Sequence, residues 1–245
     1  MSVRRAAVAA LVAAGMFGLP AGALRAASVR VVSFRTEDGV TIAASFYEAA
    51  RVPAPSVILL HMQTRSREDW QAVASRLADA GIHALALDFR GHGASGRGLP
   101  AADGGPDYSR WVLDVKAACA FLRARPDLVR AASLGIAGAS IGANVALAAA
   151  AADPAIRSLA LLSPGLNYHS LRADAAMRTY GARPALLVAA TNDPYALRSV
   201  RELATLGGGP RETRTPENAG HGTTMLDRDR DLGQALVDWF QRTLL

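Results

Sequence analysis

A serine with a glycine two residues to either side occupies residues 138–142, in the order Gly138-Ala139-Ser140-Ile141-Gly142. An apolar run, residues 131–137, precedes this pentapeptide, and a run of small residues, 143–152, follows it. Glycines at these positions allow a strand to turn sharply into a helix, which presents the serine hydroxyl at the top of a sheet. The pattern therefore predicts a nucleophile. An ordinary glycine-rich turn whose serine caps the next helix is the structural alternative.

A serine hydroxyl that reacts near neutral pH needs a base within hydrogen-bond reach and an acid that orients the base. His221 is the favoured base, because its glycine-flanked loop, residues 218–223, lies between the last predicted strand and the last predicted helix. A loop histidine that bonds only to backbone is the structural alternative. Three other histidines fit structural positions better: His83 within an apolar strand, His92 in a predicted turn and His169 in the segment after another strand.

The acid is expected on a loop that leaves the sheet between the serine and the histidine. Asp193 meets this requirement, because it follows the apolar run 185–190 almost directly. Serine, acid and histidine then occur in that chain order. An aspartate before Pro194 would also cap a helix well. Asp153 and Asp174 are weaker rivals, because neither follows a strand so directly.

Short apolar runs alternate with helical patterns along most of the chain. Two stretches of alternating polarity around Glu37-Asp38-Gly39 predict an opening β-hairpin at residues 29–34 and 41–48. Further strands are predicted at residues 56–60, 83–88, 133–137, 157–162, 185–190 and 211–215, and helices at 69–80, 108–125, 141–152, 194–206 and 232–243. This order predicts a single α/β domain over residues 28–245, with a mostly parallel sheet, helices on both faces and catalytic groups at the carboxyl ends of the strands.

Five segments, taken in order, resemble the α/β-hydrolase superfamily: Leu59-Leu60-His61, residues 88–96, the turn at residues 138–142, Asn192-Asp193 and Gly220-His221-Gly222. The resemblance covers residues 29–245. Within the superfamily the chain is most similar to compact bacterial serine hydrolases, which are grouped with dienelactone-hydrolase-like proteins and small esterases. Dienelactone hydrolases proper carry cysteine where this chain has Ser140. The resemblance implies an α/β-hydrolase fold with a short cap, which residues 163–183 are expected to carry.

The tetrahedral intermediate of acyl transfer needs two N–H groups that face its negative oxygen. One donor follows from the turn at Ser140, namely the backbone N–H of Ile141. The resemblance implies that the other comes from the loop after His61, with Gln63 as the first choice and Met62 as the second. Relatives often have glycine where this chain has Met62, so its side chain is expected to narrow the acyl site, to tilt the donor or merely to pack.

Side chains of the predicted cap region are candidates for lining the substrate pocket, with surface packing as the alternative for each. The candidates are Leu166, Tyr168, Met177 and Tyr180.

Residues 1–27 predict a secretory signal peptide with cleavage near residues 23–27. Arg4 and Arg5 form a basic start, residues 6–19 are uncharged, and Ala21-Gly22-Ala23 offers a small-residue cleavage site. A membrane anchor is the alternative, but Pro20 and Arg25 end the run before the roughly 20 apolar residues that a span needs. A secreted or periplasmic protein without a stable membrane span is therefore expected.

Charge and cysteine content argue against several functional classes. Removal of residues 1–27 deletes three arginines and no acidic residue, which lowers the formal net charge from +6 to +3. The remaining arginines are scattered among acids, so a nucleic-acid partner is disfavoured. Cys119 is the only cysteine, which excludes an intrachain disulfide and a cysteine-based metal site. Residues 91–96 match the dinucleotide-binding pattern G-x-G-x-x-G, but no helical pattern follows at once, so neither cofactor nor metal is expected.

These features together predict a serine hydrolase that cleaves a small-molecule carboxylic ester through an acyl-enzyme intermediate. Amide or thioester hydrolysis by the same three residues is the first alternative, because the pocket and not the triad selects the leaving group. A catalytically silent binding protein of the same fold is the second, and the departure at Met62 favours it. The sequence leaves the oligomeric state open.

Overall fold

The computed structural model describes residues 28–100 and 105–245 of the 245-residue chain. The signal peptide and the cleavage site predicted within residues 1–27 lie outside the described residues.

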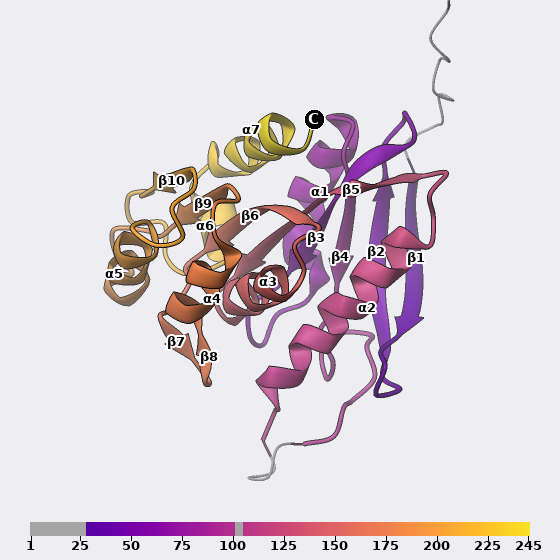
Figure 1. Ribbon diagram of the computed structural model, residues 1–245, viewed down its shortest axis with the longest axis horizontal. Helices are drawn as coiled ribbons and strands as arrows, with labels where there is room; N and C mark the ends of the chain where they lie inside the picture. Colours follow the sequence, from indigo (N-terminus) through magenta and orange to yellow (C-terminus); the bar gives the residue numbers. More distant parts are fainter. Residues whose placement is uncertain (1–27, 101–104) are drawn as a thin grey trace, which may run out of the picture.

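Eight strands of the described chain form one sheet, in the order β1-β2-β4-β3-β5-β6-β9-β10 (Figure 1). Strand β2 is antiparallel to both of its neighbours, and every other neighbouring pair is parallel. The strands are β1 (Ser28–Arg35), β2 (Thr41–Glu48), β3 (Ala54–Leu60), β4 (His83–Leu87), β5 (Val129–Ala139), β6 (Ile156–Leu162), β9 (Ala185–Val188) and β10 (Arg211–Arg214). This arrangement confirms the predicted α/β fold with a mostly parallel sheet.

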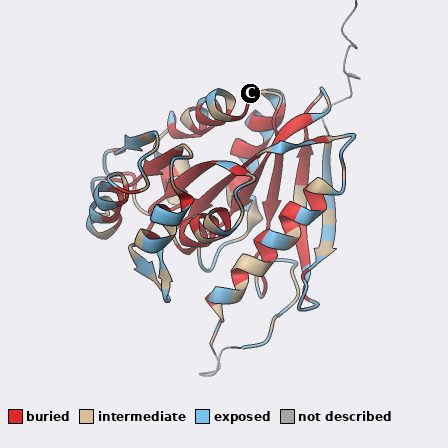
Figure 2. Ribbon diagram, in the orientation of Figure 1, coloured by how far each residue is buried: buried red, intermediate tan, exposed pale blue. Residues whose placement is uncertain are grey.

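Helices cover both faces of the sheet, because its central strands are apolar on both faces. Along β3, Ile58 and Leu60 pack into one core cluster, whereas Val57 and Leu59 pack into the other. The first cluster contains side chains of α2 (Trp111–Arg123), α3 (Ile141–Ala152), α4 (Ala173–Tyr180) and α5 (Pro194–Leu203), and the second those of α1 (Gln71–Asp79), α6 (Thr224–Arg228) and α7 (Leu232–Leu244). The sheet is accordingly the buried centre of the fold, and the helices turn their exposed residues outward (Figure 2).

Several short elements were not predicted from the sequence. Strands β7 (Asn167–Tyr168) and β8 (Leu171–Arg172) form a two-stranded hairpin, which α4 follows directly. Helix α6 follows the loop of His221. The helices predicted at residues 69–80 and 108–125 begin with 3-10 turns, η1 (Arg67–Trp70) and η2 (Tyr108–Arg110), which lead into α1 and α2. Elements of two to five residues are too short to show a period in the sequence. The hairpin and α4 make up most of the predicted cap region.

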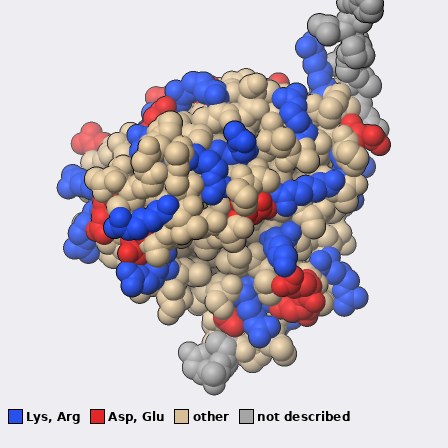
Figure 3. Space-filling view, viewed as in Figure 1, with Lys and Arg blue, Asp and Glu red and all other residues tan. Residues whose placement is uncertain are grey.

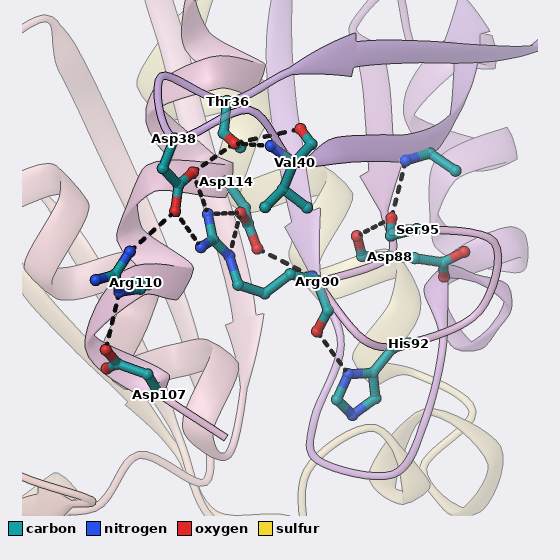
Figure 4. A network of polar contacts seen from close by, with 11 residues as sticks. Thr36, Asp38, Val40, Asp88, Arg90, His92, Ser95, Asp107, Arg110 and Asp114 are labelled. Atoms are coloured by element: carbon teal, nitrogen blue, oxygen red, sulfur yellow. Dashed lines mark hydrogen bonds and ion pairs between the residues drawn. The ribbon is translucent and has the colours of Figure 1, made fainter. Parts of the chain in front are cut away.

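A buried arginine joins the opening hairpin to α2 and to the loop after β4 (Figure 4). The Arg90 side chain is 5% exposed and donates hydrogen bonds to Asp114 Oδ1 from Nε at 2.9 Å and from Nη2 at 2.7 Å. Its Nη1 donates to Asp38 Oδ2 at 2.7 Å, in the turn between β1 and β2. The Arg90 hydrogen bond holds the pKa of Asp38 well below its usual range. Three segments that are distant in the sequence are thereby fixed to one another.

The turn at residues 88–96 is shaped by a second buried carboxylate. Asp88 accepts hydrogen bonds from the backbone N–H of Arg67 at 2.8 Å and from that of Ala94 at 2.9 Å, and it also pairs with the Arg67 guanidinium. Gly93 has a φ of 48°, and a Cβ at this position would overlap the Asp88 carboxylate. The glycines of this G-x-G-x-x-G pattern therefore belong to a structural turn, and residues 97–100, which follow it directly, are not helical.

Charged side chains of both signs are interspersed over the face shown in Figure 3, with uncharged surface between them. Within residues 28–100 and 105–245, no helix combines the length and the apolar character needed to cross a membrane.

We predict that Asp114→Ala lowers the free energy of unfolding by about 3–5 kcal/mol, because the variant leaves the buried Arg90 charge without its innermost partner. Urea denaturation at neutral pH measures the change. Glu212→Ala is the matched control, because it breaks the exposed Glu212–Arg242 pair, and we expect a change of less than about 1 kcal/mol. Equal effects of the two substitutions would contradict the role assigned to the Arg90 network.

Candidate active site

Ser140 stands at the junction of β5 and α3 in a backbone conformation that side chains rarely adopt. Its φ is 54° and its ψ is −122°. Both flanking glycines are required by close approach: a Cβ on Gly138 would overlap the Gly142 backbone, and a Cβ on Gly142 would overlap the His61 carbonyl oxygen. The turn is therefore strained and tightly packed, as expected where a hydroxyl must project from the carboxyl end of a strand.

The structure brings Ser140, Asp193 and His221 into one chain of hydrogen bonds. Ser140 Oγ lies 2.7 Å from His221 Nε2, and His221 Nδ1 lies 2.6 Å from Asp193 Oδ2. In the tautomer that fits both contacts, Nδ1–H donates to the carboxylate and Nε2 accepts from the serine hydroxyl. The His221 side chain is 42% exposed and the Asp193 side chain 12%, so solvent reaches the imidazole at the middle of the chain, whereas the carboxylate is largely covered. The arrangement can deprotonate Ser140 and stabilise the imidazolium that results.

Side chains from the neighbouring loop fix the backbone around His221. Asn192 Oδ1 accepts from the Gly220 N–H at 2.9 Å, and Thr191 Oγ1 accepts from the Asn218 N–H at 2.9 Å. Asp193 Oδ1 also accepts from the Ala196 N–H at 3.3 Å and so caps α5. One oxygen of the Asp193 carboxylate thus caps α5 and the other contacts His221. The interpretation of Asp193 as a helix cap is therefore compatible with its interpretation as the acid that orients the histidine.

A second connection, of which the sequence carries no signal, holds the His221 loop to η1. The Thr223 hydroxyl donates to Asp69 Oδ2. Asp69 also accepts two hydrogen bonds from Arg65 Nε, at 2.9 and 3.0 Å. Asp69 and Thr223 are 154 positions apart, and neither lies in a recognisable motif.

The position expected for an oxyanion hole lies between the start of α3 and the loop after β3. The Ile141 N–H begins α3, where helix geometry leaves the first N–H groups without helical acceptors. The His61 carbonyl faces Gly142, so the Met62 N–H of the same trans peptide points away from α3. The Met62 carbonyl in turn accepts from His61 Nδ1–H at 2.7 Å and from the Arg65 N–H at 3.3 Å. These contacts fix the Met62–Gln63 peptide and favour the Gln63 N–H as the second donor.

The Met62 side chain packs against the His221 loop. Its sulfur lies 2.5 Å from the place that a Cβ on Gly222 would occupy, and it is partly buried against the core cluster of α1 and α7. Gly222 has a φ of 60°. The Met62 side chain is therefore accommodated by a glycine on the facing loop.

His61 is a buried, neutral positioning group. Its Nε2 accepts a hydrogen bond from the Phe89 N–H at 3.0 Å, and its Nδ1–H donates one to the Met62 carbonyl oxygen. Burial lowers the pKa of His61 to about 4, because neighbouring side chains exclude water from the ring. The loop after β3 is thus joined through His61 to the loop after β4.

The structure separates the four pocket candidates. Tyr168 lies beside Ser140: burial raises the pKa of Tyr168 to about 12, and a hydrogen bond with the Ser140 side chain acts in the opposite direction. Leu166 is partly buried against the core. Met177 and Tyr180 do not reach the site. Both are buried on the inner face of α4, and the Tyr180 hydroxyl donates to the Pro184 carbonyl beside the amino end of β9, opposite Ser140. The sequence could not show which face of this short helix meets the core.

Asn144 holds the cap region to α3, and this role was not predicted from the sequence. It stands one turn after Ser140 on α3 and is 2% exposed. Its Nδ2 donates to the Gly165 carbonyl at 2.8 Å and to the Leu171 carbonyl at 2.9 Å, and its Oδ1 accepts from the Gly165 N–H at 3.1 Å. These bonds attach the β7–β8 hairpin to the helix that carries Ser140. An asparagine inside a helix of small apolar residues was the available signal.

Among the described residues, no group of three or more His, Cys, Asp or Glu side chains is arranged to hold a metal ion.

Comparison with known proteins was made at the level of family and of fold. The model of a family described as "Serine aminopeptidase, S33" matches residues 52–204, which include Ser140 and Asp193. A comparison with curated proteins finds no match.

Solved structures of similar fold include an esterase of Pyrococcus furiosus, with a TM-score of 0.73 and 20% identity over 89% of this chain and 92% of that chain. Dienelactone hydrolase from Anabaena variabilis has a TM-score of 0.72 and 18% identity, covering 90% of this chain and 100% of its own. The esterase domain of a Rhodothermus marinus protein has a TM-score of 0.70 and 19% identity, covering 89% and 100%. At these identities the likeness concerns the fold.

We predict that the free energy of unfolding falls by about 3 kcal/mol between pH 7 and pH 4 because of His61 alone. The unfolded histidine takes up a proton near its ordinary pKa of 6.5, whereas the folded one does so only near 4. The contribution of His61 to the free energy of unfolding is therefore fully present above pH 6.5 and is lost as the pH falls. Urea denaturation at several pH values measures this loss. In His61→Asn, which keeps a donor near the Nδ1 position, the loss between pH 7 and pH 4 is expected to be smaller by about the same amount. An identical pH dependence in both proteins would contradict the prediction.

Proposed function

Because the chain belongs to the serine aminopeptidase S33 family of α/β hydrolases, we propose that it is a serine hydrolase that cleaves carboxylic esters of small molecules. The observation that carries this proposal is the hydrogen-bond chain from Asp193 through His221 to Ser140. The esterases among proteins of similar fold support it.

In the proposed reaction, Ser140 Oγ attacks the ester carbonyl carbon while its proton moves to His221 Nε2. Asp193 stabilises the imidazolium through Nδ1–H. The carbonyl oxygen becomes negative and accepts hydrogen bonds from the N–H groups of Ile141 and Gln63. The intermediate then expels the alcohol, whose oxygen takes the proton from His221 as the C–O bond breaks. Water then gives a proton to His221 Nε2 and attacks the acyl carbon, and the second intermediate breaks its bond to Ser140 Oγ, which takes that proton back as the acid is released.

Three carboxylates in the loops around the site are engaged by other side chains and are therefore not free to bind the α-ammonium group of a peptide substrate. An aminopeptidase needs a carboxylate that can bind the substrate's α-ammonium group. Asp193 is engaged by His221, Asp69 by Arg65 and Thr223, and Asp88 by Arg67. These three carboxylates of the surrounding loops already have partners.

Amide or peptide hydrolysis is the second candidate function, and the description of the matching family favours it. The same triad performs both reactions, so the leaving group must be tested directly. We expect kcat/KM to be highest for an acetyl oxyester, compared with the matched thioester and anilide. A higher value for an amino-acid anilide with a free amine than for its N-acetyl form would favour the aminopeptidase.

We further propose that the protein is exported, with residues 1–27 removed. The basic start at Arg4 and Arg5 and the uncharged run that follows support this. Amino-terminal sequencing of the protein from its own cell envelope or medium tests it, and a retained Met1 would contradict it.

We predict that Ser140→Ala lowers kcat for an activated acetyl ester by about a million-fold, while the fold persists. The variant removes the attacking oxygen but keeps the turn. A fluorophosphonate is expected to label the wild-type protein at Ser140 and to leave the variant unlabelled, as mass spectrometry of the intact protein and its peptides would show.

Ser75→Ala is the control, because Ser75 is exposed on α1 and has no part in the site. It is expected to keep both activity and labelling. Undiminished hydrolysis by folded Ser140→Ala protein would overturn the mechanism. Failure of the fluorophosphonate to label folded wild-type protein would favour a catalytically silent binding protein.

A further inference from the structure

The side chain of Gln63 is anchored by a tyrosine that the sequence did not connect with the site. Gln63 Nε2 donates to the Tyr108 hydroxyl at 2.5 Å. Gln63 is exposed, whereas Tyr108 is only 7% exposed. An exposed loop residue is therefore attached to a buried ring, which limits the conformations that its backbone can adopt.

Tyr108 occupies a rigid position. It begins η2, where Asp107 caps the turn by accepting from the Ser109 N–H and also pairs with Arg110. Figure 4 shows that Arg110 in turn reaches Asp38 of the Arg90 network. The Tyr108 ring also packs against Trp111, with 5.0 Å between ring centroids.

The cap hairpin holds the same ring from the other side. The His169 ring stacks on Tyr108 with 4.0 Å between centroids and 19° between planes. His169 lies at the tip of the β7–β8 hairpin, whose base is attached to α3 by Asn144. Contacts therefore run from the helix of Ser140 through the hairpin and Tyr108 to Gln63.

The loop after β3 needs such an anchor on its outer side. Its inner side is fixed by the Met62 carbonyl, which bonds to His61 and Arg65. Beyond Gln63 the chain is exposed, and Thr64 has a φ of 63°. Within the described chain, no acceptor is bonded to the Gln63 N–H. The Gln63 N–H belongs to the Met62–Gln63 peptide, so the contacts of the Met62 carbonyl hold this N–H from one side, and the side-chain contact with Tyr108 restrains Gln63 from the other.

We propose that Tyr108 is a positioning residue for catalysis, which holds the Gln63 N–H toward the oxyanion through its hydrogen bond to the Gln63 side chain. The inference rests on the proposed function. Tyr108 does not touch the substrate in this proposal; it acts through Gln63. A donor held in place before the reaction stabilises the negative oxygen more than one that must be ordered during it.

Tyr108→Phe tests the proposal, because it removes the hydroxyl and keeps the ring between His169 and Trp111. We expect kcat for an acetyl ester to fall about tenfold with KM unchanged, since complete loss of one oxyanion donor costs about 100-fold to 1,000-fold and a displaced donor costs less. An alkylboronic acid, whose tetrahedral adduct with Ser140 places an oxygen in the same position, is expected to bind more weakly by the same factor. The melting temperature checks that the variant is folded.

A double-mutant cycle separates this role from a general effect on packing. Gln63→Ala keeps the N–H and removes the side chain that Tyr108 holds, so it is expected to lower kcat by a similar factor. The double variant is expected to lose no more than the larger single loss, because both changes break the same contact. Tyr195→Phe is the matched control. It removes a hydroxyl that bonds to the Asn167 backbone of the same hairpin, and turnover is expected to stay at the wild-type level.

Wild-type turnover in folded Tyr108→Phe, multiplied losses in the double variant, or an equal loss in Tyr195→Phe would each overturn the proposal. These results are distinguishable from failure of the proposed function. If the proposed function were wrong, Ser140→Ala would remain active. If only the role of Tyr108 were wrong, Ser140→Ala would be inactive and Tyr108→Phe would keep wild-type turnover.

Discussion

The close approach of three backbones at Ser140 is the constraint on which the rest of the site depends. The end of β5, the first turn of α3 and the end of β3 meet with no room for a Cβ at Gly138 or Gly142. A serine with a positive φ costs free energy, and the buried strands and helix on either side must offset that cost. Because His61 lies against Gly142, the same packing that holds Ser140 at the end of β5 also places the start of the loop after β3.

Loops from several strand ends are joined to one another as well as to the sheet. Asn192 bonds to the backbone of the His221 loop, and Thr223 of that loop bonds to Asp69. Asp88 joins the loop after β4 to the loop after β3 through Arg67. A site assembled from separate loops requires such connections, since hydrogen-bond donors act in catalysis only when they are held in advance. Arginine–carboxylate pairs hold these loops together, and the pairs do not include the Ser140 hydroxyl.

The β7–β8 hairpin makes the cap part of the site. It is attached to α3 through Asn144 and meets Tyr108 through His169, so its position is tied both to the helix that follows Ser140 and to the loop of Gln63. Tyr168 in the same hairpin lies beside Ser140. Small caps can therefore take part in positioning, in addition to limiting access.

Local patterns were enough to predict the order and type of the long elements, the turn at Ser140 and the chain order of Ser140, Asp193 and His221, because hydrophobic period and glycine spacing are local properties. Only the tertiary structure brought His221 within 2.7 Å of a serine 81 positions away, and only it placed Met177 and Tyr180 in the core. It alone paired Tyr108 with Gln63 and Asp69 with Thr223. Such contacts depend on the paths of loops and on which face of a short helix meets the sheet, and neither is encoded in a local pattern.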